Sequence, residues 1–217
     1  MNRTARVLFS FLIIVLAGSA SAGVVGPATS DTRGRILDNV YTSPSGSFRL
    51  RIPKLLKPGA KVRDEIPAPG VLLVSFTDDL CREFIVSEEP GNLGSQSLEA
   101  WVDENVVEKL KPLGVEVRER KVLQTRNGIA RGLRYQHPGA APCGNITFRE
   151  GKRVDTKPDA DVGMYVLYAD GVFYRLIYVK GVGPGLGDSA FDIQRGPVDE
   201  LLARFADGFE IVRIRAR

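Results

Sequence analysis

Cysteine and histidine are almost absent from this sequence. Its 217 residues include two cysteines, Cys81 and Cys143, and one histidine, His137. Zinc sites made of four cysteines, or of two cysteines and two histidines, are therefore excluded. A Ser-His-Asp triad would depend on His137, which stands in a His-Pro-Gly turn, and the sequence has no Gly-x-Ser-x-Gly motif. We expect an exposed loop histidine, no catalytic residues and no cofactor.

A long apolar run is also lacking. The most apolar stretch, from Val7 to Ala17, has eleven residues, whereas a membrane-spanning helix needs about 20. Two arginines precede this stretch and Ala20-Ser21-Ala22 follows it, which is the pattern of a secretory signal peptide. We expect residues 1–22 to be cleaved off between Ala22 and Gly23. The product would be periplasmic or secreted, without stable membrane insertion.

Neither sign of charge dominates the chain. Thirty Lys and Arg residues stand against 26 Asp and Glu residues, and charged residues make up 26% of the total, as in ordinary globular proteins. Removal of residues 1–22 takes away two arginines and no acid, which lowers the formal net charge from +4 to +2. Long-range attraction to polyanions is weak at this net charge, so we expect no nucleic-acid partner.

The two cysteines predict one disulfide bond. An exported chain with two cysteines usually joins them, because its compartment is oxidising. Cys81 begins an apolar-alternating run and Cys143 lies in a loop-rich stretch, so the bond would close a long loop and stabilise the fold. Two free thiols, with Cys81 as a small buried residue, are the alternative. A catalytic redox pair is not indicated, because the cysteines lack Cys-x-x-Cys spacing.

Hydrophobic periodicity begins only at Val40. Residues 23–39 are rich in Gly, Ala, Ser and Asp and predict a flexible leader, so the predicted single domain covers residues 40–217. Four prolines between Pro53 and Gly70 predict an irregular segment there.

Within this domain, turn and capping signals separate strands from helices. Asn127-Gly128 and Asp170-Gly171 indicate β-hairpins. Apolar residues at helical spacing indicate one helix over residues 98–113, capped by Ser97, and another over residues 197–205. About six or seven strands, mostly linked as hairpins, and two main helices predict an α+β fold with a mostly antiparallel sheet covered by helices.

Two groups of side chains are candidate sites. Asp155, Asp159 and Asp161 resemble a calcium-binding loop, although their spacing misses the EF-hand pattern and a solvated loop would explain them equally. An aromatic group on two adjacent strands can line a ligand groove or simply pack the sheet. Its members are Tyr165, Tyr168, Phe173, Tyr174 and Tyr178.

A series of short motifs runs from residue 41 to about residue 215. They are Tyr41-x-Ser43-x-x-Gly46-x-Phe48, Ile52-Pro53, Ser97-Leu98-x-x-Trp101, Asn127-Gly128-x-Ala130-x-x-Leu133-x-Tyr135, Asp170-Gly171-x-Phe173-Tyr174 and Phe205-x-x-x-Phe209-x-Ile211. In these motifs the chain resembles the PsbP-like/DcrB-like group of exported proteins. The resemblance implies an α/β/α sandwich around an antiparallel sheet and an accessory or partner-binding role without shared catalytic residues.

These observations favour an exported, periplasmic, non-enzymatic accessory or binding protein. It would present a sheet face or groove to an envelope protein or a small ligand, neither of which the sequence identifies. One alternative is an envelope hydrolase or calcium-binding protein that uses Asp155, Asp159 and Asp161. A second alternative is a structural envelope protein that oligomerises through a strand edge.

Mass spectrometry of the exported protein without reductant tests the two covalent predictions. We expect the mass of residues 23–217 less two hydrogen atoms, because signal cleavage removes the first segment and oxidation to the disulfide removes one hydrogen from each thiol. A mass that includes residues 1–22 would contradict the cleavage. Alkylation of both thiols without prior reduction would contradict the disulfide.

Overall fold

A computed structural model gives the fold of most of the chain. It describes residues 30–31, 33–53, 61–77, 81–143, 145–149, 152–182 and 198–212. The predicted signal peptide and its Ala22–Gly23 cleavage site lie outside the described residues. No helix in the described ranges is long and apolar enough to cross a membrane.

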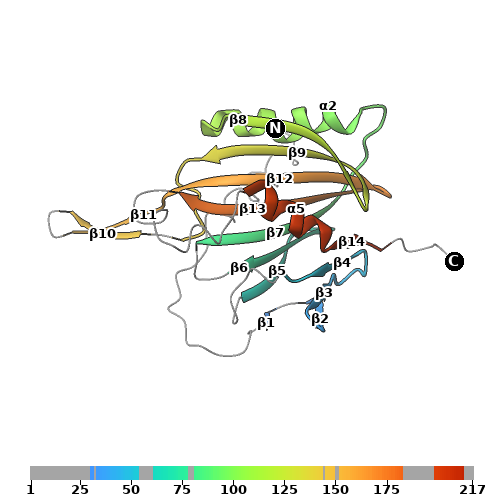
Figure 1. The fold of residues 1–217 in the computed structure, drawn as a ribbon, viewed down its shortest axis with the longest axis horizontal. Coiled ribbons are helices and arrows are strands. Elements are labelled where there is room, and N and C mark those ends of the chain that lie inside the picture. The colour runs from blue at the N-terminus through green and yellow to red at the C-terminus, as the bar shows by residue number, and fades with distance from the viewer. Residues whose placement is uncertain are drawn as a thin grey trace.

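An eight-stranded sheet forms the centre of the molecule (Figure 1). Seven of its strands run antiparallel to their neighbours, and only β1 pairs in parallel, with β5. In spatial order the strands are β1 (Ser30–Asp31), β5 (Lys61–Ala68), β6 (Val71–Thr77), β7 (Arg82–Pro90), β13 (Val172–Val182), β12 (Asp159–Ala169), β9 (Gly128–His137) and β8 (Val117–Thr125).

The central strands are buried on both faces. Successive side chains of a strand point to opposite faces, and in β12 Met164 and Val166 pack on one face while Tyr165 and Leu167 pack on the other. The sheet therefore separates two hydrophobic cores. Each core is completed by a helix, which makes the predicted α+β sandwich, and that prediction is confirmed.

One face is covered by the helical segment over residues 98–113. It consists of α2 (Leu98–Val102), a π-helical turn η1 (Asp103–Val107), α3 (Glu108–Leu110) and a 3₁₀ turn η2 (Lys111–Leu113). The Ala100 amide donates to Ser97 Oγ at 3.1 Å, so the predicted N-cap is confirmed. The segment ends at Gly114, whose φ of 71° is the left-handed conformation that glycine adopts easily.

The other face is covered by α5 (Val198–Asp207) and a second sheet. This sheet has the order β14 (Phe209–Ile211), β4 (Phe48–Arg51), β3 (Val40–Thr42) and β2 (Arg35–Leu37). α5 approaches β12 closely at Gly163, where a Cβ atom would lie 2.7 Å from Val198 Cγ1. Glycine at this position thus sets how deeply the helix sits on the sheet.

The predicted hairpins are confirmed, but the strands β5, β10 (Asn145–Arg149) and β11 (Lys152–Thr156) were not predicted. β8 and β9 meet at Asn127-Gly128, and β12 and β13 meet at Asp170-Gly171, where both turn residues have positive φ. The segment predicted as irregular contains β5. β10 and β11 form a further hairpin. Their alternation is too short or too polar to separate strands from loops.

Part of the predicted leader belongs to the fold. Residues 30–31 and 33–39 of the predicted leader take part in the fold: β1 pairs with β5, β2 pairs with β3, and the segment is held by Asp64 on β5. Its carboxylate accepts from the amides of Arg33 and Gly34 at 2.6 and 2.7 Å and from the Tyr41 hydroxyl at 2.7 Å. A buried carboxylate needs such donors. The sequence does not reveal which donors Asp64 finds, because Arg33 and Gly34 lie 31 and 30 positions away from it along the chain.

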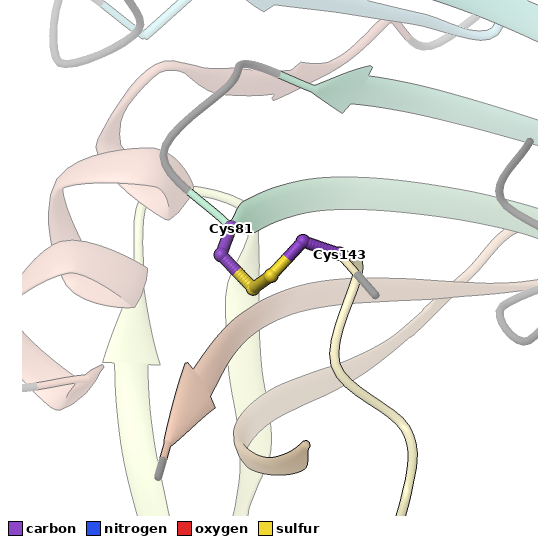
Figure 2. Close-up of a disulfide and its surroundings, with 2 residues drawn as sticks. All are labelled: Cys81 and Cys143. Atoms are coloured by element: carbon purple, nitrogen blue, oxygen red, sulfur yellow. A yellow bond between two sulfur atoms is a disulfide. The ribbon is translucent and has the colours of Figure 1, made fainter. Parts of the chain in front are cut away.

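The predicted disulfide joins the start of β7 to the loop after β9. Figure 2 shows the side chains of Cys81 and Cys143 meeting there, and their Cα atoms lie 4.9 Å apart. The bond spans 62 positions of sequence. It therefore ties the loop that precedes β10 to the central sheet.

Loss of the disulfide should lower the free energy of unfolding. In the double variant Cys81→Ala/Cys143→Ala we expect a decrease of about 4 kcal/mol, because the unfolded chain regains the entropy of a long open loop. Urea unfolding of the variant and of the oxidised wild type measures the difference. The reduced wild type is the matched control and should resemble the variant. Equal midpoints for all three proteins would contradict the prediction.

Candidate functional site

The five aromatic residues of the predicted groove lie on both faces of the main sheet. Tyr165, Tyr174 and Tyr178 belong to the core under α5. Phe173 lies on the face of α2, where its ring contacts Tyr168 at 4.7 Å. Because neighbouring positions of a strand face opposite sides, these rings cannot line one groove. They pack the two faces of the sheet, which is the alternative that the sequence left open.

The three aspartates of the predicted calcium loop are spread over two strands. Asp155 is in β11, opposite Ile146, and the other two are in β12. Asp159 accepts from the Gly139 amide at 3.1 Å, and Asp161 pairs with Arg134 at 2.8 Å. The loop interpretation is therefore corrected. Among the described residues no group of three or more acidic, cysteine or histidine side chains is placed to hold a metal ion.

His137 also differs from its expected setting. It ends β9 and is 9% exposed, so it is not an exposed loop residue. Its Nδ1 lies 2.9 Å from the carbonyl oxygen of Pro138. This histidine therefore contributes to the packing of the turn that leads to Cys143.

The best candidate for a binding site is an open depression between α5 and the second sheet. Its volume is about 690 Å³. We call it the arginine depression, because four arginines line it beside two acids and several apolar residues: two from β4, one from the turn after β8 and one from α5. The lining residues are Val40, Arg49, Arg51, Ile52, Pro53, Arg126, Leu201, Arg204, Phe205, Asp207, Gly208 and Glu210.

Strand alternation places the first two arginines. In β4, Phe48 and Leu50 are fully buried against the main sheet, so Arg49 and Arg51 point outward from the second sheet. β4 is hydrogen-bonded on one side to β3 and on the other to β14. These pairings hold the backbone of both arginines in place.

The other two arginines already have partners. Arg126, in the turn between β8 and β9, donates to the Asp207 carbonyl oxygen at 3.2 Å and lies 3.8 Å from Glu210 Oε2. Arg204 pairs with Glu200 one turn earlier in α5. Within the described part of the chain, the side chains of Arg49 and Arg51 have no such ion pair. The depression thus has positive charge available for an anionic ligand.

A polar network lies at the β3–β4 turn. Glu88 on β7 is 9% exposed, and Ser45 Oγ donates to its Oε2 at 3.4 Å. Burial raises the pKa of Glu88, although hydrogen bonds from Ser47 and Ser45 act in the opposite direction. Burial, together with the nearby charge of Glu88, raises the pKa of Tyr174 to about 12. These groups attach the turn to the main sheet.

A second charged group is buried under α2. Arg175 is 5% exposed and pairs with Glu89 at 2.7 Å, while its Cζ atom lies 5.6 Å from the centre of the Trp101 ring. Trp101 stacks on Phe173 with ring centres 3.7 Å apart. Burial and the charge of Arg175 lower the pKa of Lys109. The ion pair joins β7 to β13, and the contact of Arg175 with Trp101 links it to α2.

Sequence reasoning missed the arginine depression. The signal for part of it was present, because Arg49 and Arg51 alternate with Phe48 and Leu50. That alternation shows that both arginines face solvent. It does not show that α5 and the turn after β8 lie close to β4 in the fold.

Comparison with known proteins gives structural neighbours only. No protein-family model matches the chain, and no curated protein matches it. The solution structure of cyanobacterial PsbP (CyanoP) from Synechocystis is 14% identical, with a TM-score of 0.49, and the match covers 89% of this chain and 98% of that one. A crystal structure from Bacteroides thetaiotaomicron is 11% identical, with a TM-score of 0.42, over 81% of this chain and 48% of that one.

One partly buried acid should make the stability of the protein depend on pH. Burial raises the pKa of Glu83 on β7 to about 7, although a hydrogen bond from Ser75 and the charge of Lys157 act in the opposite direction. A raised folded-state pKa means that the bound proton stabilises the fold. This contribution is complete below the ordinary pKa of 4.5 and is lost as the pH rises through 7.

The Glu83→Gln variant should lack this part of the pH dependence. Between pH 4.5 and 7 we expect the wild type to lose up to about 3 kcal/mol of unfolding free energy through this group. Urea unfolding at a series of pH values measures it. Glu116→Gln, at an exposed position before β8, is the matched control and should keep the wild-type slope. An unchanged slope in Glu83→Gln would contradict the assignment.

Proposed function

We propose that the protein is an exported, non-enzymatic accessory protein that binds an anionic partner protein of the cell envelope through the arginine depression. The observation that carries the proposal is the convergence of four arginines on one open depression, two of them exposed and without an ion pair among the described residues. Guanidinium groups bind carboxylates and phosphates through paired hydrogen bonds.

The chemistry of the depression favours binding over catalysis. Arginine stays protonated at any physiological pH and has no acceptor atom, so it serves poorly as a general acid or base. The acids in the lining, Asp207 and Glu210, lie beside arginines, where they balance charge. Export is supported by the disulfide between Cys81 and Cys143, since such bonds persist in oxidising compartments.

Oligomerisation through a strand edge has less support. β8 is one of the two edge strands of the main sheet, and it carries the charged run Arg118-Glu119-Arg120-Lys121. Charged side chains on an edge strand oppose pairing with another strand. Arg120 and Lys121 are moreover engaged with Asp103 and Asp199, at 2.7 and 3.1 Å.

Site-specific crosslinking in cells tests the proposal. A photoreactive residue introduced at Val40, inside the depression, should crosslink one reproducible envelope protein. The charge reversal Arg49→Glu/Arg51→Glu should remove this product, because it turns attraction into repulsion. A photoreactive residue at Arg63, exposed on β5, is the matched control and should not give the product. Crosslinking from Val40 that survives the charge reversal, or the lack of any product, would overturn the proposal.

A further inference from the structure

We infer that the arginine depression binds an extended acidic segment of the partner, in which every second residue is Asp or Glu. The inference rests on the proposed function of the depression and adds the conformation and residue pattern of what binds there. Arg49 and Arg51 carry it, because they are the two lining arginines that have no ion pair among the described residues.

The spacing of these arginines fits an extended chain. They are two positions apart on β4 and point to the same face, so their Cα atoms lie about 7 Å apart along the strand. In an extended peptide, side chains on one face repeat at the same distance. Two acidic residues separated by one position can therefore each meet one guanidinium. Adjacent acids would point to opposite faces.

The apolar residues of the lining also favour an extended segment bound along β4. Val40 lies directly opposite Arg51 on the neighbouring strand, and Ile52 and Pro53 continue the lining beyond β4. These side chains provide a surface for the uncharged atoms of a bound segment. The depression is open, whereas a pocket for a small molecule usually encloses most of its ligand.

The acids of the depression argue against a membrane surface as the binding partner. Asp207 and Glu210 line the same hollow as the arginines, and Glu210 lies opposite Arg49 in the strand register. A broad anionic surface would bring negative charge against both acids.

Two synthetic peptides of equal composition test the inference. In one, Asp and Thr alternate; in the other, the same Asp residues form a single block. Fluorescence anisotropy with the exported protein should show the alternating peptide binding about tenfold more tightly than the blocked peptide. The variant Arg49→Gln/Arg51→Gln should lose this preference. Arg63→Gln, which changes an exposed arginine on β5, should retain it.

The outcomes separate this inference from the proposed function. Equal affinity for both peptides, lost in Arg49→Gln/Arg51→Gln, would overturn the alternating pattern and leave the depression as the binding site. Binding to phosphatidylglycerol vesicles but to neither peptide, again lost in that variant, would overturn the peptide as ligand. Binding of the alternating peptide that is unchanged in the variant would overturn the role of the depression itself. Unchanged unfolding of the variant confirms that any loss is local, since both side chains are exposed.

Discussion

The close contact between α5 and β12 at Gly163 determines the layout of one whole side of the molecule. A Cβ atom there would come within 2.7 Å of Val198 and 3.1 Å of Leu202, so a larger residue would push the helix away from the sheet. After α5 the chain passes through Gly208 and enters β14. The carbonyl oxygen of Gly208 accepts a hydrogen bond from the Arg51 amide at 2.9 Å. The depth of α5 therefore fixes where the second sheet stands, and with it the hollow that the arginines line.

Local sequence signals were sufficient for the elements with strong punctuation. Ser97 and Gly114 bound the first helix, and Asn127-Gly128 and Asp170-Gly171 form the hairpins, because caps and tight turns depend on a few neighbouring residues. The disulfide was predicted because the chain has two cysteines and a predicted signal peptide for export to an oxidising compartment. β5 could not be recognised, since Pro67 lies within it and its exposed residues outnumber its buried ones.

Features that depend on distant partners were beyond the sequence. Asp64 orders the segment near Arg33 only because β5 lies beside it in the fold. The aromatic residues were recognised as sheet residues, but the sequence left open whether they line a groove or pack the sheet, because it does not show which face each ring takes. The arginine depression draws on strands, a turn and a helix that are far apart in the chain. Topology, more than residue type, decides which charges become neighbours.

The position of Trp101 has a spectroscopic consequence. It is the only tryptophan of the chain, and its ring is stacked between the α2 segment and Phe173, beside the buried Arg175. Intrinsic tryptophan emission therefore reports on one helix–sheet interface alone. The arginine depression lies on the opposite face of the main sheet, between α5 and the second sheet. A change in emission on binding would show that the two faces communicate through the strands between them.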